Sequence, residues 1–260
     1  MNKKVYFVSD AHLGSKMHVD SVETERKLCR WLDFVKEDAQ AIYLLGDIFD
    51  YWFEYKTVVP RGFTRLLGKL SEITDSGVVV RFFIGNHDIW LTDYLQNECG
   101  LIVHRNPFVT ELSGKKFFIA HGDGLADGSA SFRILRKIFH STFLRCCFAA
   151  IHPRWTVGLA HAWSNKSRES GGVQDFLGED YEYLIQFAKQ EIVRTPDIDY
   201  FVFGHRHLLL DLPLNEKSRV INIGDWIQHF SYGVFDGKEM RLEKFSSFKY
   251  QSLGNFQGSL

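Results

Sequence analysis

The sequence predicts an α/β fold in which a parallel β-sheet packs against a second, more antiparallel sheet. The N-terminal part alternates apolar runs with amphipathic segments in the order strand, helix, strand, helix, strand, which indicates a parallel sheet with right-handed crossovers. Later parts carry short apolar runs joined by turn signals, which are typical of antiparallel strands. The chain has 260 residues, of which 45% are hydrophobic, so residues 1–260 can fill the core of a single large domain with an insertion.

The first five elements follow from hydrophobic spacing. Continuous apolar runs indicate buried strands, and apolar residues at helical spacing indicate amphipathic helices. The strands are expected at residues 5–8, 41–45 and 78–84, and the helices at residues 21–37 and 63–73. The first helix begins with capping-box spacing between Asp20 and Glu23, and the second is expected to end near Gly77.

The later elements are shorter and are separated by turn signals. The strands are expected at residues 101–103, 108–112, 116–120, 199–203, 219–223, 232–235 and 240–245. Residues 113–115 and the Asp-Gly pair at 236–237 predict hairpin turns, and residues 181–194 have the pattern of an amphipathic helix. These strands are expected to build the second sheet.

Residues 128–170 form a different kind of segment, which we expect to be a helical insertion. No Asp or Glu occurs between residues 128 and 168, where Arg and Lys are interleaved with Phe, Leu and Trp. Such a segment can be a solvated helical face, a nucleic-acid contact or a surface for an anionic lipid. The net charge of −1 for the whole chain argues against an extended nucleic-acid track.

The remaining composition favours a cytoplasmic location. The four cysteines lack the CxxC spacing of a zinc site, and two of them are adjacent, so free thiols in a reducing compartment are expected. The N-terminus enters a strand directly without the apolar core of a signal peptide. No stretch approaches the length of a membrane span, about 20 apolar residues.

Polar side chains gather behind five of the expected strands. The five clusters are Asp10 with His12, then Asp47, then Asn86 with His87 and Asp88, then His121, and finally His205 with His207. Ligand sites in α/β folds are built at the carboxyl ends of strands. Residues two apart in an extended chain point the same way, so the first and last clusters can each offer two ligands to one place. A single Asp-x-His is more often a polar turn, but five clusters in this order indicate a site.

The donor set predicts a pair of divalent metal ions. It mixes imidazole nitrogens, carboxylates and one amide oxygen without a thiolate, which disfavours structural zinc and favours hydrolytic metals. We expect two ions, most readily Mn²⁺, with Fe, Zn²⁺ and Mg²⁺ as alternatives, and Asp47 as the bridge between them. Two metals about 3.5–4 Å apart clamp the attacking and leaving oxygens of phosphoryl transfer and lower the pKa of a bound water.

The motifs Asp-x-His, Gly-Asp, Gly-Asn-His-Asp, His-Gly-Asp and Gly-His-x-His, in this order over residues 5–224, resemble those of the calcineurin-like metallophosphoesterases. The resemblance implies two packed mixed sheets flanked by helices in a four-layer sandwich. It implies one metal on Asp10, His12, Asp47 and His207, and the other on Asp47, Asn86, His121 and His205. His87 would be an outer-shell acid that protonates the leaving oxygen or steadies the transition state, with Asp88 orienting it.

Residues 9–13, 46–52 and 121–123, with the insertion after them, resemble the UDP-2,3-diacylglucosamine pyrophosphatases of lipid A biosynthesis. That family implies cleavage of UDP-2,3-diacylglucosamine to UMP and 2,3-diacylglucosamine 1-phosphate at the cytoplasmic face of the inner membrane. It implies a peripheral enzyme with the insertion as a lid over the acyl chains, and neither nucleic acid nor an obligate protein partner is expected. The substrate-binding residues it implies are Asn86, His87, Asp127, Ser164, Lys166, Arg168 and His205.

One position departs from this narrower family. The better-known branch has an arginine where this chain has His87. The departure leaves open a divergent branch with the same reaction, or an enzyme for another nucleotide diphosphate or a phosphodiester, including a nuclease-type substrate. A non-catalytic scaffold is the remaining alternative, and the complete ligand clusters argue against it.

Overall fold

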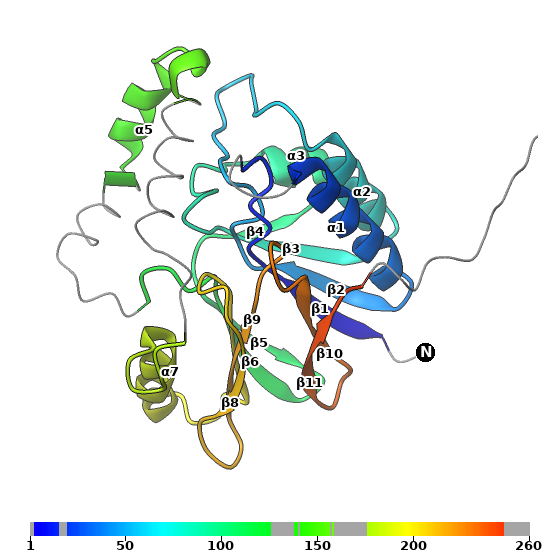
Figure 1. Ribbon diagram of the computed structural model, residues 1–260, viewed down its shortest axis with the longest axis vertical. Helices are drawn as coiled ribbons and strands as arrows, with labels where there is room; N and C mark the ends of the chain where they lie inside the picture. Colours follow the sequence, from blue (N-terminus) through cyan, green and yellow to red (C-terminus); the bar gives the residue numbers. More distant parts are fainter. Residues whose placement is uncertain are drawn as a thin grey trace, which may run out of the picture.

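The computed structural model describes residues 3–15, 20–125, 138–139, 141–156, 158 and 176–246. The strands are β1 (Lys4–Val8), β2 (Ala39–Leu44), β3 (Val79–Phe83), β4 (Ile102–His104), β5 (Phe108–Leu112), β6 (Lys115–Ile119), β7 (Tyr200–Phe203), β8 (Leu209–Pro213), β9 (Arg219–Ile223), β10 (Ser231–Phe235) and β11 (Met240–Lys244). The helices are α1 (Ser21–Val35), α2 (Thr64–Asp75), α3 (Tyr94–Cys99), α5 (Thr142–Ala149) and α7 (Tyr183–Arg194). Together the strands form two mixed sheets that face each other (Figure 1).

The first sheet has six strands in the order β11-β10-β1-β2-β3-β4. β1 to β4 run parallel, and β10 joins them antiparallel to β1, with Val5 opposite Phe235. The predicted parallel core is therefore confirmed. The expectation that the C-terminal strands and residues 101–103 all belong to the second sheet was wrong, because β4, β10 and β11 extend the first sheet at its two ends.

The second sheet has five strands in the order β5-β6-β7-β9-β8. Its centre is parallel (β6 with β7, and β7 with β9), whereas β5 and β8 are antiparallel edges. The sheet is thus mixed rather than mainly antiparallel. Two elements were not predicted, namely the edge strand β8, which ends at Pro213, and the six-residue helix α3.

Three hydrophobic clusters hold the layers together. The first lies between the six-stranded sheet and helices α1, α2 and α3, and it contains the fully buried Trp31. The second lies between the two sheets, with Phe117 on one side and Phe7 on the other at 6.1 Å between ring centroids. The third joins the five-stranded sheet to α7 through Leu184. The order helix, sheet, sheet, helix is the predicted four-layer sandwich.

The start of α1 shows how local sequence sets an element. Asp20 is the N-cap, and its carboxylate accepts a hydrogen bond from the amide of Val22 at 3.0 Å, as capping requires. Glu23 does not complete the predicted capping box, because its side chain pairs with Arg30 instead, at 2.6 Å. Within the part of the chain that is described, no helix has the length and apolar character that crossing a membrane would take.

Candidate metal centre

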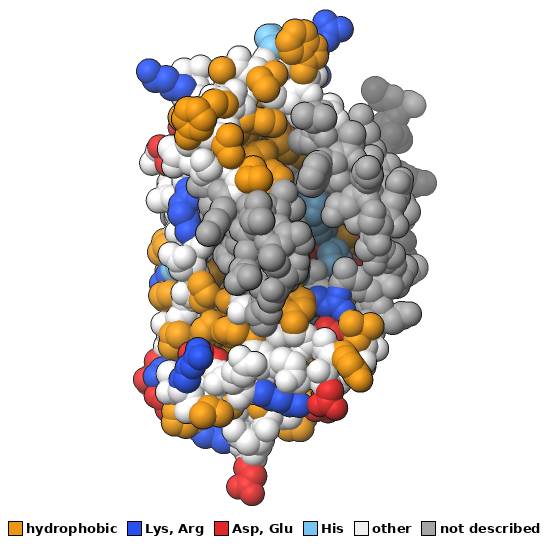
Figure 2. Space-filling model, turned by 90° about the vertical axis from the view of Figure 1, so that its left-hand side faces the viewer, with side chains coloured by type: hydrophobic (Ala, Val, Ile, Leu, Met, Phe, Trp, Pro, Cys, Tyr) orange, Lys and Arg blue, Asp and Glu red, His pale blue; other side chains and the backbone are white. Residues whose placement is uncertain are grey.

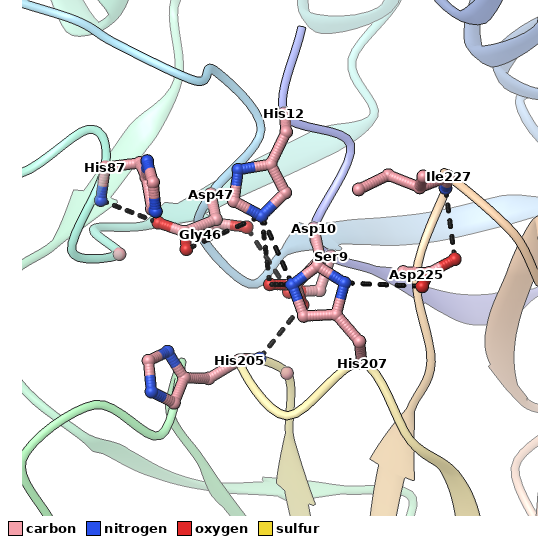
Figure 3. A network of polar contacts seen from close by, with 12 residues as sticks. Ser9, Asp10, His12, Gly46, Asp47, His87, His205, His207, Asp225 and Ile227 are labelled. Carbon is pink, nitrogen blue, oxygen red and sulfur yellow. Dashed lines mark hydrogen bonds and ion pairs between the residues drawn. The ribbon is translucent and has the colours of Figure 1, made fainter. Parts of the chain in front are cut away.

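The carboxyl ends of five strands deliver the predicted polar clusters to one place between the two sheets. Figure 3 shows the residues from four of these strand ends, namely Asp10, His12, Asp47, His87, His205 and His207. β1 is followed by Asp10 and His12, β2 by Asp47, β3 by residues 86–88, β6 by His121, and β7 by His205 and His207. The first three strands belong to the six-stranded sheet and the last two to the five-stranded sheet. The candidate site therefore exists only because the two sheets pack against each other.

The backbone at this site is held in a conformation that non-glycine residues avoid. Among the described residues, eight non-glycine residues have positive φ, and five of them are predicted ligands. These are Asp10 (φ 55°), His12 (42°), Asp47 (51°), His205 (65°) and His207 (54°). Left-handed backbone at such residues costs roughly 1–3 kcal/mol each and persists where the surroundings enforce it, which is typical of functional sites.

Two glycines allow the loops to approach each other. A Cβ at Gly85 would collide with the carboxylate and backbone nitrogen of Asp47, and a Cβ at Gly204 would collide with the hydroxyl of Ser9 and with Asp10. Neither glycine has positive φ, so close packing rather than backbone freedom requires them. The glycines that precede the ligands in the sequence thus set the distance between clusters.

The first group of candidate ligands is Asp10, His12 and His207, whose ligand atoms all lie within 4.8 Å of one another. Nε2 of His12 is 3.3 Å from Nε2 of His207 and 3.8 Å from Oδ1 of Asp10. On its other side His207 points Nδ1 at the carboxylate of Asp225, 3.3 Å away. Because an ionised carboxylate can only accept hydrogen bonds, Nδ1 of His207 is the donor, and its Nε2 is turned toward the group.

The second group is Asp47, His121 and His205, again within 4.8 Å. Nε2 of His121 is 3.3 Å from Oδ2 of Asp47, 3.2 Å from Nδ1 of His205 and 3.4 Å from Oδ1 of Asn86. Nδ1 of His121 donates to the carbonyl of Leu45 at 2.7 Å, which leaves Nε2 to the group. Asp47 also lies 3.8 Å from His12, so it connects the two groups.

These residues fit divalent cations. Oδ1 of Asp10 is buried and has no hydrogen-bond partner, a state that costs free energy unless something else satisfies the oxygen. In each group two imidazole nitrogens face each other, at 3.3 Å between His12 and His207 and at 3.2 Å between His121 and His205. One ring in each pair, that of His207 or His121, already donates a hydrogen bond through its second nitrogen. Converging nitrogens with carboxylate and amide oxygens form the donor set expected for Mn²⁺, Fe or Zn²⁺.

Burial and mutual charge shift the pKa values in the second group. Burial alone would raise the pKa of the Asp47 carboxyl, but the imidazoles of His121 and His87 hold it well below its usual range. Burial would lower the pKa of His121, but Asp47 raises it well above the ordinary value. For His205, burial and the nearby His121 lower the pKa well below the ordinary value, which keeps His205 in the neutral form that ligates metals.

The first group shows the same competition. Burial raises the pKa of the Asp10 carboxyl. Burial would lower the pKa of His207, but the carboxylates of Asp10 and Asp225 raise it. Burial would likewise raise the pKa of Asp225, yet hydrogen bonds from His207 and backbone amides lower it to about 2. Asp225 is therefore ionised at neutral pH and orients His207, as carboxylates behind metal-binding histidines do.

His87 and Asp88 have separate surroundings. Nδ1 of His87 donates to the carbonyl of Asp50 at 3.0 Å, and its side chain is 15% exposed. Asp88 is fully buried and accepts from the amides of Gly85 at 2.7 Å and Ile48 at 3.1 Å. The prediction that Asp88 orients the His87 ring was wrong, because Asp88 closes the loop turn and a backbone carbonyl orients the ring. Burial and the charge of Asp47 raise the pKa of Asp88 to about 8.

Asp225 and Asp50 lie at the site but were not among the predicted site residues. Asp225 follows β9 in a Gly-Asp pair, the same pattern that identified Asp47 after β2, so the signal was present. Oδ1 of Asp50 lies 3.7 Å from Nδ1 of both His12 and His87, and it belongs to residues 46–52, which carry the family resemblance, although no role was predicted for Asp50. The predicted residues Asp127, Ser164, Lys166 and Arg168 lie outside the described residues.

The described part of the insertion packs on the loops that carry the site. The hydroxyls of Tyr55 and Thr156 are 2.7 Å apart, and the indole of Trp90 donates to the carbonyl of Phe139 at 3.0 Å. The ring of Phe148 on α5 packs against Trp90 in a tilted arrangement, at 4.9 Å between centroids. Figure 2 shows histidine side chains in a hollow below a group of hydrophobic side chains at the end of the molecule that bears α5.

Comparison with known proteins gives the chain its context. The family model described as calcineurin-like phosphoesterase matches residues 3–209. A UDP-2,3-diacylglucosamine hydrolase of Porphyromonas gingivalis is 50% identical over 94% of this chain and 98% of its own. A UDP-2,3-diacylglucosamine hydrolase of Neisseria meningitidis is 29% identical over 86% and 90%, respectively. Among solved structures, the phosphoesterase Yfce from E. coli has 16% identity and a TM-score of 0.42, covering 89% of this chain and 87% of that one.

Proposed function

The chain belongs to the calcineurin-like phosphoesterase family, and we propose that it hydrolyses the pyrophosphate bond of UDP-2,3-diacylglucosamine in lipid A biosynthesis. The products are UMP and 2,3-diacylglucosamine 1-phosphate. The observation that carries the proposal is the convergence of five strand-end clusters on one site, in a chain that is 50% identical to a UDP-2,3-diacylglucosamine hydrolase over 94% of its length.

We assign the ligands to two divalent ions, with Mn²⁺ the first candidate and Fe, Zn²⁺ and Mg²⁺ the alternatives. One ion would be held by Asp10, His12, Asp47 and His207, and the other by Asp47, Asn86, His121 and His205. Ions bound there would supply Lewis-acid activation of water and neutralise charge on the phosphoryl group. Asp47 connects the two ligand groups, since its Oδ2 lies 3.3 Å from Nε2 of His121 and 3.8 Å from Nε2 of His12.

The protein's own groups then orient the reacting parts. Nδ1 of His87 donates to the carbonyl of Asp50, so the ring carries a proton on Nε2 only as the imidazolium. In that form its Nε2 would donate a hydrogen bond or a proton to the phosphoryl group. Asp225 fixes the tautomer of His207 in the same way. We infer attack on the nucleotide-side phosphorus, so that the acylated sugar phosphate is the leaving group.

Turnover of two substrates tests this function. With Mn²⁺ present, UDP-2,3-diacylglucosamine is expected to react far faster than bis-p-nitrophenyl phosphate, and equimolar UMP should appear. In water enriched in ¹⁸O the label should enter UMP. The same rate on both substrates would instead support a general phosphodiesterase, and label in the sugar phosphate would contradict attack on the nucleotide-side phosphorus.

We further propose that residues 128–170 form a lid inserted in a single domain of residues 1–260, with Asp127, Ser164, Lys166 and Arg168 contacting the sugar and phosphates. Asn86, His87 and His205 would bind the diphosphate. Among the described residues, α5 and the segment after it expose Phe143 at 75% and Trp155 at 70%. Exposed aromatic side chains beside arginines suit acyl chains and the anionic cytoplasmic face of the inner membrane, so we place the enzyme there as a peripheral protein without nucleic-acid or obligate protein partners.

The double variant Phe143→Ser/Trp155→Ser tests the lid. Full burial of one large apolar side chain is worth about 1.5–3 kcal/mol, so we expect binding to phosphatidylglycerol vesicles to weaken at least about tenfold and KM for the diacyl substrate to rise. Turnover of bis-p-nitrophenyl phosphate should stay unchanged. The matched control is Val193→Ser on α7, where an apolar side chain is 81% exposed. Equal losses on both substrates, or an equal effect of the control, would contradict the lid.

A further inference from the structure

We propose that Arg206 and Glu182 form a positioning pair that holds residues 204–207 in the conformation that brings His205 and His207 to the metal centre. The inference rests on the proposed dinuclear site, because it concerns how that site is assembled. Neither residue belongs to the predicted ligands, and neither contacts a candidate ligand atom through its side chain. Both act through the backbone between two ligands.

The pair is buried and has ideal geometry for two charged groups. Nε of Arg206 donates to Oε2 of Glu182 at 2.9 Å, and Nη2 donates to Oε1 at 2.8 Å. Arg206 is 7% exposed and Glu182 is 2% exposed. Two parallel bonds of this kind fix the orientation of the guanidinium as well as its position. The side chain of Arg206 is thus fixed relative to the start of α7, where Glu182 is the N-cap residue.

The loop between β7 and β8 needs such a restraint. His205 and His207, which flank Arg206, both have left-handed backbone (φ 65° and 54°), which side-chain-bearing residues avoid unless the surroundings enforce it. The amide of Arg206 donates to the carbonyl of Gly204 at 2.7 Å, and Asn222 donates to the same carbonyl, also at 2.7 Å. These bonds fix Gly204, but they do not determine the direction of the following side chains.

Fixing Arg206 adds to two other restraints on that direction, the amide of His205 on Oδ2 of Asp10 at 2.9 Å and Nδ1 of His207 on Asp225 at 3.3 Å. The imidazole of His205 lies against His121 at 3.2 Å, and the imidazole of His207 lies 3.5 Å from Asp10. The guanidinium between them instead reaches the first turn of α7. If it were released, the loop could relax toward ordinary backbone angles, and both imidazoles would leave their groups together. One ion pair therefore serves both proposed metals, since His205 belongs to one and His207 to the other.

The pair also connects the metal centre to the chain segment that follows the insertion. Oε1 of Glu182 accepts a second hydrogen bond from the amide of Leu177 at 3.1 Å, at the point where the described chain resumes after residue 175. One residue further along, the hydroxyl of Tyr183 donates to the carbonyl of Gly122 at 3.4 Å. Thus the first turn of α7 contacts both loops of the five-stranded sheet that carry ligands.

Metal affinity and stability must be measured separately to test the pair. Removing one partner leaves a buried charge and destabilises the chain, whereas replacing both partners by apolar residues is often neutral for stability. We would compare the wild-type chain with Glu182→Gln and with the double variant Glu182→Leu/Arg206→Met. Mn²⁺ binding would be measured by calorimetry, Mn–Mn coupling by electron paramagnetic resonance, and Tm on the metal-free proteins.

We expect the variants to differ in Tm but to share a loss of Mn²⁺ affinity. Glu182→Gln should lower Tm and weaken Mn²⁺ binding about 10- to 100-fold, the usual effect of removing a group that orients a metal ligand. The double variant should recover most of the wild-type Tm but keep the weakened binding and lose the Mn–Mn coupling. Should Glu182→Gln fail to fold, the double variant carries the test alone. The matched control is Asp211→Leu/Arg219→Met, which replaces an ion pair of 2.6 Å between β8 and β9 and should leave Mn²⁺ binding unchanged.

Two outcomes overturn the inference, and they differ in what else they overturn. If the wild-type chain binds Mn²⁺ and the double variant binds it with equal affinity and coupling, the pair is only structural and the proposed function stands. If the wild-type chain binds no divalent ion, the dinuclear site itself is wrong, and the positioning role falls with it.

Discussion

Asp47→Ala is expected to abolish metal-dependent hydrolysis while the fold stays largely intact. Asp47 is the residue that connects the two ligand groups, with Oδ2 at 3.3 Å from His121 and at 3.8 Å from His12. Lewis-acid stabilisation by metals is worth several kcal/mol, and each 1.36 kcal/mol is a factor of ten in rate. We therefore expect kcat to fall at least about a thousandfold.

The measurement is turnover of the diacyl substrate together with the number of Mn²⁺ ions bound per chain. Asp47→Asn is the matched control, because it retains an oxygen that can accept from the amide of His87 as Oδ1 does now at 2.8 Å, but it carries no charge. We expect the asparagine variant to lose metal and activity nearly as fully as the alanine variant. A variant without Asp47 that keeps two ions and normal turnover would remove this residue from the bridging position.

His87→Ala is expected to lower kcat about 100- to 1000-fold without changing the metal content. That is the usual loss when a donor to a developing oxyanion is removed. The leaving group of the proposed reaction is a phosphate with a second pKa of about 6, so it needs little help from an acid. We therefore expect the main role of His87 to be charge stabilisation of the phosphoryl group.

His87→Arg separates the two roles that the sequence left open. Arginine keeps a positive charge and donors but cannot give up a proton in a protein. With a stabilising role, the arginine variant should retain activity within about tenfold of wild type, whereas an acid role predicts a loss as large as that of alanine. Metal loss in His87→Ala would instead make His87 a ligand, which its place within 4.8 Å of His12 and Asp47 allows.

The sequence was most informative where a buried strand is followed closely in the chain by a candidate ligand. β1, β2 and β3 are mostly apolar and are followed within about three residues by Asp10, Asp47 and Asn86, so strand and site residues could be predicted from the same short stretches. The carboxyl-end rule for α/β sheets then placed the clusters at one edge. In the structure the seven side chains predicted as ligands lie within or beside the two groups of candidate ligands.

Assignment of strands to sheets could not be predicted. β10 and β11 have the local pattern of an antiparallel hairpin, but that pattern is the same whether the hairpin pairs with β1 or with the second sheet. The choice is made by long-range contacts such as Val5 opposite Phe235. The edge strand β8 was missed because Asp211 and Pro213 interrupt its apolar run, and α3 was missed because six residues are too few to show helical periodicity.

The supporting residues of the site were hardest to predict. Asp50, Glu182 and Arg206 act through distances of 2.8–3.7 Å to residues far away in the sequence, and a carboxylate or a guanidinium alone carries no motif. Asp88 is a further example. Its position next to His87 suggested that it orients the His87 ring, but in the structure Asp88 accepts from backbone amides instead. Three-dimensional packing, not spacing, decides which polar side chains meet.

Anomalous X-ray scattering from crystals soaked in Mn²⁺ tests the two-metal site most directly. We predict two anomalous peaks about 3.5–4 Å apart, one beside Asp10, His12 and His207 and the other beside His121 and His205, with the Asp47 carboxylate between them. A single peak, or peaks that Asp47 does not touch, would contradict the dinuclear hydrolytic centre proposed for this chain.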